Sequence, residues 1–134
     1  MLPFLDSPLL IAQAIGLVGF GVNVTAMLQK DDRRMKWLLV LTACILALHF
    51  YLLGAMTGAW MMVISASRFA VSLHPQAKKF TLPFLLTYAL MGSITYVDWV
   101  DLFPIASGVI ATFSVFYFSG IKMRSFLLVG SCLW

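Results

Sequence analysis

Five side chains that can bond or stack stand inside or beside the apolar runs of this sequence. They are two amides, an imidazole, an indole and a guanidinium, at Gln13, Asn23, His49, Trp60 and Arg68. A polar group within a lipid-spanning segment is costly, and such groups are therefore candidates for function. We predict that these five side chains contact a small solute.

Three of these side chains also have a structural interpretation. Asn23 either hydrogen-bonds a solute hydroxyl or joins neighbouring helices. His49 is a solute contact or a pH-sensitive gate, or it bonds an adjoining helix. Arg68, with Ser65 and Ser67 nearby, either binds an anionic group or extends its charge to the membrane surface.

The first apolar run carries a stripe of residues at helical spacing. Its members recur three and four positions apart: Gln13, Gly16, Phe20, Asn23 and Met27. We expect this stripe to face protein.

Several kinds of site are missing from the sequence. His49 is the only histidine within an apolar run, because His74 stands in a polar gap, so neither paired haem ligands nor a multi-histidine metal site is expected. The five carboxylates all stand at segment ends or in gaps, which argues against an intramembrane proton or sodium relay. No catalytic triad, zinc spacing or nucleotide loop is present, so we expect no cofactor and no enzyme.

The composition requires lipid around the chain. Of 134 residues, 62% are hydrophobic and 10% are charged, against about a quarter charged in ordinary soluble domains. A soluble fold of this size could not cover that much apolar surface. The net charge of +4 is spread over three gaps, so nucleic acid is not an expected partner.

Six apolar segments follow from the positions of charge, glycine and proline. The first five are long enough for us to expect complete membrane helices, at about 9–28, 37–53, 60–73, 80–96 and 102–120. The sixth begins at Ser125 and rises only about 15 Å. We expect either a fragment of a longer protein, ending inside helix six, or a re-entrant segment. The N-terminus lacks the basic residues of a cleaved signal, so the first helix is expected to be retained.

The basic residues alternate strictly between gaps. All nine follow the first, third or fifth segment or lie near those ends: Lys30, Arg33, Arg34, Lys36, Arg68, Lys78, Lys79, Lys122 and Arg124. By the positive-inside rule these gaps are cytoplasmic, which predicts a multi-pass protein with its N-terminus outside. Trp60 then also fits an outer aromatic belt.

An internal repeat appears at an offset of 88 residues. It aligns Arg34-Met35-Lys36 with Lys122-Met123-Arg124, and Cys44 with Cys132. Helices one and two would then correspond to five and six. A repeat of three helices crosses the membrane an odd number of times, so a second copy joined directly to the first would be inverted. The fourth segment is therefore predicted to be a linker helix that keeps the two repeats parallel.

Several stretches resemble a known family. The run 29–32 (QKDD), the segment 47–54 (ALHFYLLG) and the stretches 119–124 (SGIKMR) and 128–134 (LVGSCLW) are similar to the YgjV family of bacterial inner membrane proteins. The predicted arrangement also resembles the SWEET and PQ-loop superfamily of small-solute carriers. That resemblance implies a 3+1+3 parallel-repeat bundle, although prolines are absent from the middles of helices one and two, where such carriers hinge.

The sequence therefore predicts an all-α membrane protein forming one transmembrane domain over 1–134. Repeat one covers about 9–73, the linker helix about 80–96, and the start of repeat two about 102–134. We expect a bacterial inner membrane protein that passively carries a small neutral or weakly polar solute; the alternative is a non-transporting accessory or scaffold protein. Its expected partners are the lipid bilayer and that solute, and a homo-oligomer is compatible with the pattern.

Overall fold

A computed structural model describes residues 7–95, 98–99 and 102–133. Within them the chain forms six α-helices and one short 3-10 helix, without strands. The elements are α1 (Ser7–Leu28), α2 (Asp32–Leu52), α3 (Met56–Val71), η2 (Ala77–Phe80), α4 (Thr81–Thr95), α5 (Leu102–Tyr117) and α6 (Gly120–Cys132). The expectation of an all-helical chain is confirmed for this part of the sequence.

Three helices begin clearly earlier than the apolar runs predict, and one of them is α3, which begins at Met56 instead of about Trp60. Helix α2 begins at Asp32 instead of Trp37, and α6 begins at Gly120 instead of Ser125. Lysine and arginine are good helix formers, so α2 and α6 include the basic residues that precede their apolar runs. Lys122 and Arg124 consequently lie in the first turns of α6 and not in a gap.

The turn between α2 and α3 is shorter than the predicted one, which ran from Gly54 to Ala59. Gly54 has a φ of 75°, a left-handed conformation that a residue without a side chain adopts readily. The N–H of Ala55 donates to the carbonyl of Phe50, and the N–H of Gly54 donates to that of Tyr51. This pair of bonds is a Schellman motif, and it ends α2.

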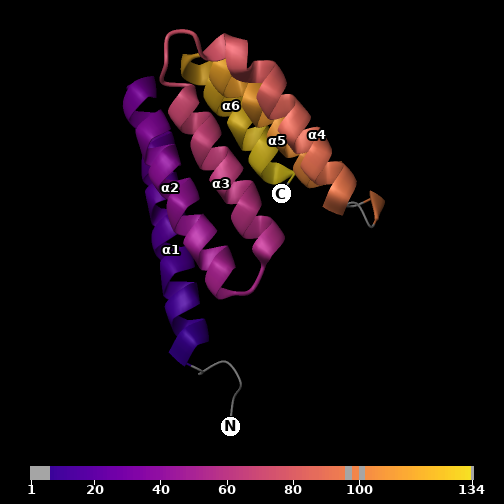
Figure 1. The fold of residues 1–134 in the computed structure, drawn as a ribbon. Helices are drawn as coiled ribbons and strands as arrows, with labels where there is room; N and C mark the ends of the chain where they lie inside the picture. The colour runs from indigo at the N-terminus through magenta and orange to yellow at the C-terminus, as the bar shows by residue number, and fades with distance from the viewer. Residues whose placement is uncertain (1–6, 96–97, 100–101, 134) are drawn as a thin grey trace. The chain divides into compact units, whose positions relative to one another are not determined.

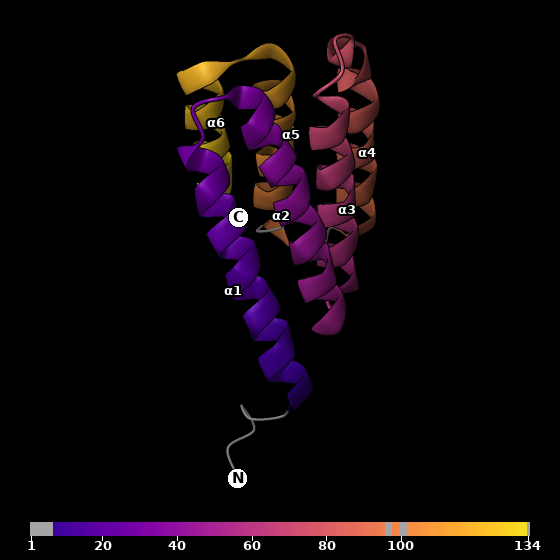
Figure 2. The same ribbon diagram turned by 90° about the vertical axis from the view of Figure 1, so that its left-hand side faces the viewer.

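The helices divide into two compact units after Ala70. In the first unit α1 and α2 form a long antiparallel hairpin, drawn in indigo to purple in Figures 1 and 2. The second unit contains η2, α4, α5 and α6, with α5 packed against both α4 and α6. The predicted single domain, its repeat boundaries and the 3+1+3 arrangement stay predictions.

The second unit is held by close side-chain contacts along α5. The rings of Phe84 and Phe116 lie 5.8 Å apart, which joins α4 to α5. The buried Ser114 hydroxyl donates to the carbonyl of Met123 on α6, at 2.7 Å. These contacts fix both hairpins as antiparallel.

Large apolar side chains remain exposed on both units. On α1, Leu17 is 72% exposed, and on α4 a stripe at four-residue spacing ends at Ile94, 70% exposed. The other stripe members are Leu82, Leu86 and Leu90. Exposed apolar stripes of this length fit a lipid surrounding.

Two described helices are long and apolar enough to cross a membrane, namely α1 and α2. At 22 and 21 residues they measure about 33 and 31 Å, close to the thickness of a hydrocarbon core of about 30 Å. Helices α3 to α6 are shorter than that core. Five complete spans therefore stay a prediction.

Candidate functional site

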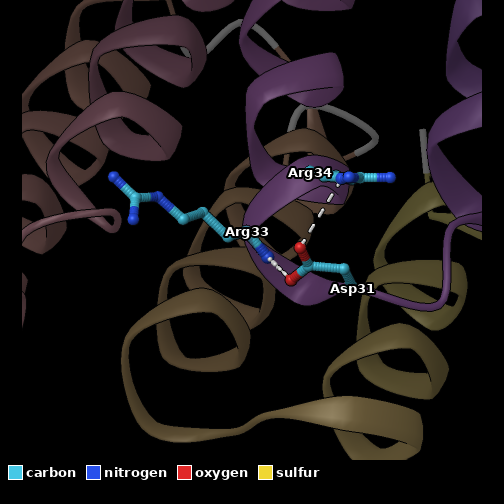
Figure 3. Close-up of polar contacts among 3 residues, drawn as sticks. All are labelled: Asp31, Arg33 and Arg34. Atoms are coloured by element: carbon cyan, nitrogen blue, oxygen red, sulfur yellow. Dashed lines mark hydrogen bonds and ion pairs between the residues drawn. The ribbon is translucent and has the colours of Figure 1, made fainter.

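The α1–α2 hairpin begins at a capped turn. Asp31 has an extended backbone, and its carboxylate accepts a hydrogen bond from the backbone N–H of Arg33 at 2.9 Å. The other carboxylate oxygen lies 3.8 Å from Nε of Arg34 (Figure 3). This cap starts α2 directly after α1 ends, so the two helices run back along each other.

Small residues on α1 let α2 approach closely. The buried residues of α1 are Ala12, Gly19 and Ala26, seven residues apart. A methyl group added to Gly16 would lie 2.7 Å from Cε1 of His49, so the imidazole occupies the space that a side chain would need. The face of α1 toward α2 thus follows these small residues.

The predicted stripe on α1 was partly wrong. Gly16 lies against His49 of α2 and Asn23 is half-buried, but Gln13 is exposed and Phe20 is 62% exposed. The true seam follows the residues at which the two backbones come closest. The predicted stripe was chosen by polarity and size, and several of its positions lie one residue away from the buried residues of α1.

The imidazole of His49 is fixed by a hydrogen bond across the hairpin. Its Nδ1 lies 2.7 Å from the carbonyl oxygen of Ala12. A carbonyl only accepts hydrogen bonds, so Nδ1 must carry the proton and act as the donor. In the neutral ring Nε2 then holds a lone pair and can accept a hydrogen bond.

The register of the hairpin sets two polar side chains opposite each other. Gly16 meets His49, and Gly19 meets Leu46, one turn along. One more turn on each antiparallel helix places Asn23 opposite Thr42. Asn23 is half-buried and Thr42 is 5% exposed.

Neither polar side chain of this pair is hydrogen-bonded within the part of the chain that the structure describes. The Thr42 hydroxyl and the Asn23 amide form no hydrogen bond with any residue that the structure describes. A buried polar group left in this way costs about 1–3 kcal/mol. By register, His49 and the Asn23–Thr42 pair thus lie about two turns apart along the seam, and their side chains form a line of polar groups there.

Thr42 was missed in the sequence because a threonine within an apolar run also fits packing or a bond to its own helix. Thr25 shows that ordinary case, since its hydroxyl donates to the carbonyl of Gly21 at 2.9 Å. What identifies Thr42 is its position opposite Asn23, and that position can be found only from the structure of the hairpin.

The other predicted residues lie away from this line. Gln13 is exposed on α1, and Trp60 is 61% exposed near the start of α3. Arg68 is buried near the opposite end of α3, with its guanidinium 4.8 Å from the centre of the Phe69 ring. The hairpin thus brings Asn23 and His49 onto one seam and leaves these three outside it.

Groupings typical of metal sites do not occur in the described residues. No three His, Cys, Asp or Glu side chains gather there as metal ligands would. Cys44 and Cys132 are both free thiols.

Comparison with known proteins places the chain among membrane proteins. Residues 10–134 match the Imp-YgjV family model, described as a bacterial inner membrane protein. The inner membrane protein YgjV of Escherichia coli strain K12 is 24% identical over 124 residues, which cover 92% of this chain and 68% of that protein. No solved structure matches the chain.

Proposed function

The chain belongs to the Imp-YgjV family of bacterial inner membrane proteins, and on that premise we propose that it is a passive carrier of a small neutral or weakly polar solute. The observation that carries this proposal is the line formed by Asn23, Thr42 and His49. These groups can donate and accept hydrogen bonds at a depth where lipid offers none.

The chemistry of the line sets the kind of solute. An amide and a hydroxyl each donate and accept, while Nε2 of His49 accepts. The residues of α1, from Ser7 to Leu28, carry no charge. A neutral solute with hydroxyl or amide groups matches this arrangement without an accompanying ion. A carrier needs no bond-breaking group, and the proposal includes that the chain is not an enzyme.

The proposed topology is multi-pass with the N-terminus outside, and a 3+1+3 repeat. Its support comes from the alternating basic residues and from the 88-residue offset. Helix α2 begins at Asp32 and α6 at Gly120, 88 residues apart, each after an extended N-cap residue. Buried residues recur at the same offset: Ala26 and Ser114, Met35 and Met123, Leu39 and Leu127.

The predicted repeat also supports a functional role for Asn23 and Thr42. At the offset of 88, Asn23 corresponds to Ala111 and Thr42 to Gly130, both buried in the second unit. The α5–α6 hairpin thus has an alanine and a glycine at these two positions, and neither has a polar side chain. Packing does not demand the amide and hydroxyl of the first unit.

The test is uptake into liposomes that contain the purified chain. A panel of labelled sugars, organic acids and vitamins is screened first, and the transported solute is then measured for Thr42→Val and Asn23→Leu. We expect at least a tenfold loss of uptake, with unfolding stability unchanged or increased because an unused buried polar group is removed. Thr25→Val is the matched control, since it removes an exposed hydroxyl bonded to its own helix.

Wild-type uptake by Thr42→Val and Asn23→Leu, or an equal loss in Thr25→Val, would contradict the assignment of the seam.

The competing function is a non-transporting accessory or scaffold protein. It is favoured by the face of α1 at Gly21, where an added methyl group would meet none of the described residues within 4 Å. Such an open position lets a partner helix approach closely. Absence of flux for every solute of the panel would favour this function.

A further inference from the structure

The two histidines of the sequence, His49 and His74, differ in which ring nitrogen carries the proton. Nδ1 of His49 lies 2.7 Å from the carbonyl oxygen of Ala12, so Nδ1 is the protonated nitrogen. Nδ1 of His74 instead accepts a hydrogen bond from the backbone N–H of Gln76 at 3.2 Å, so the proton of the neutral ring is on Nε2. In the neutral state, Nε2 of His49 is thus an acceptor and Nε2 of His74 is a donor.

The contact with α1 keeps His49 in this state. A methyl group added to Gly16 would lie within 3.2 Å of Cε1, Nδ1 and Nε2, so the ring packs directly on the backbone there. If the proton moved from Nδ1 to Nε2, a lone pair would face the carbonyl of Ala12 and the bond would be lost. No group that the structure describes donates to Nε2. The neutral ring therefore offers a solute one acceptor and no donor.

A proton added to this ring must bind at Nε2, because Nδ1 already carries one. Protonation keeps the bond to Ala12 and turns Nε2 from an acceptor into a donor. His49 lies in the last turn of α2, so about 5 Å of helix separates it from the end of α2. Histidine is the side chain that changes charge between about pH 5 and pH 8. Protons from water at this end of the hairpin can thus compete with a solute for Nε2.

The helices of the first unit place few charged groups near the ring. Helix α1 has no charged residue, and α2 has none between Lys36 and His49. The charged residue of α3, Arg68, lies in its last turn, away from the α2–α3 turn, and the other titratable side chains of α2 near the ring are Cys44 and Tyr51. The carboxylates of the sequence all lie outside α1, α3 and the second half of α2: Asp6, Asp31, Asp32, Asp98 and Asp101. A carboxylate near the ring would change the pH at which it takes a proton, but not the atom that takes it.

We propose that Nε2 of His49 is a specificity-determining acceptor for a hydroxyl of the solute, and that a proton bound at the same atom prevents this contact. This proposal rests on the carrier function proposed above. Uptake is then fastest when the ring is neutral and falls as the pH is lowered. The carbonyl of Ala12 is the positioning group, because it fixes the proton on Nδ1 and leaves Nε2 for the solute.

The first measurement is nitrogen-15 NMR of the full chain in detergent micelles, with labelled histidine. At about pH 8, His49 should show a protonated Nδ1 and an unprotonated Nε2, whereas His74 should favour the reverse; the variant His74→Gln assigns the two sets of signals. On acidification, Nε2 of His49 should take up the proton while Nδ1 keeps its own. A neutral His49 with its proton on Nε2 would overturn the proposal, and this result does not depend on transport.

The second measurement is uptake into liposomes at about pH 8 and about pH 5. It uses the labelled sugars and neutral vitamins of the panel, because their own charge does not change with pH. Wild-type uptake should fall about tenfold between the two values. His49→Gln retains an acceptor oxygen but takes up no proton, so its uptake should change by less than about twofold. His74→Gln is the matched control and should keep the full pH dependence.

The outcomes separate this proposal from the carrier function. Wild-type uptake that is equal at both pH values, or a fall that is as large in His49→Gln as in the wild type, would overturn the role of His49 and leave the carrier function standing. Absence of uptake of the whole panel at about pH 8 would overturn the carrier function and the role of His49 with it.

Discussion

Replacing Gly16 by alanine probes the closest contact in the α1–α2 hairpin. The added methyl carbon would lie 2.7 Å from Cε1 and 2.9 Å from Nδ1 of His49, so the ring or the helix must move. Moving the ring breaks the 2.7 Å bond to the carbonyl of Ala12.

The expected cost has three parts. A hydrogen bond between membrane helices contributes about 0.6 kcal/mol, and at most about 1.7. Overpacking a close contact costs about 1–3 kcal/mol, and the higher helix propensity of alanine offsets about 1 kcal/mol. Gly16→Ala should therefore lower the free energy of unfolding by about 1–3 kcal/mol.

The assay is reversible unfolding in mixed micelles of increasing dodecyl sulfate, followed by circular dichroism. Gly21→Ala is the control, because its methyl group meets none of the described residues within 4 Å; it should be neutral or stabilising by up to about 1 kcal/mol. In a His49→Ala background the cost of Gly16→Ala should largely disappear. If the cost is the same in both backgrounds, the ring does not occupy the space beside Gly16 and the described seam is wrong.

Three further changes test other parts of the chain by the same unfolding assay. Asp31→Ala removes the N-cap of α2 and should cost about 1 kcal/mol. Ser114→Ala removes the buried bond to the carbonyl of Met123 and should cost about 1 kcal/mol, mostly by loosening α6. Gly108→Ala places a methyl group 2.5 Å from the Tyr88 ring and should cost about 1–3 kcal/mol.

The control for the serine variant is Ser125→Ala, whose hydroxyl donates only within its own helix, to the carbonyl of Ile121. It should change stability by less than Ser114→Ala does. An equal effect of the two serine changes would show that the bond between α5 and α6 is not formed. A neutral Gly108→Ala would likewise refute the close packing of α4 on α5.

Hydropathy was sufficient to predict the helical class and the number of helices. Each of the six described helices overlaps one predicted apolar segment. The starts of α2 and α6 were misplaced because charged residues interrupt an apolar run without interrupting a helix. Helix limits depend on caps such as Asp31, and the run itself does not contain that information.

The candidate site was only partly predictable for a geometric reason. Asn23 and His49 are recognisable from sequence because an amide or imidazole within an apolar run is unusual. Thr42 is not, since its importance comes from its position opposite Asn23. That position depends on the register of two helices, which Gly16 and Gly19 set by their lack of side chains.

The placement of Asn23 opposite Thr42 is the basis of the proposed solute site. It is tested most directly by disulfide cross-linking in bacterial membranes, with Cys44 and Cys132 replaced by serine. Two cysteines can join only when their Cα atoms lie within about 7 Å. The pair Asn23→Cys/Thr42→Cys should oxidise readily, whereas Phe20→Cys/Thr42→Cys should stay reduced because Phe20 is exposed. Efficient oxidation of the Phe20 pair, with a reduced Asn23 pair, would contradict the account.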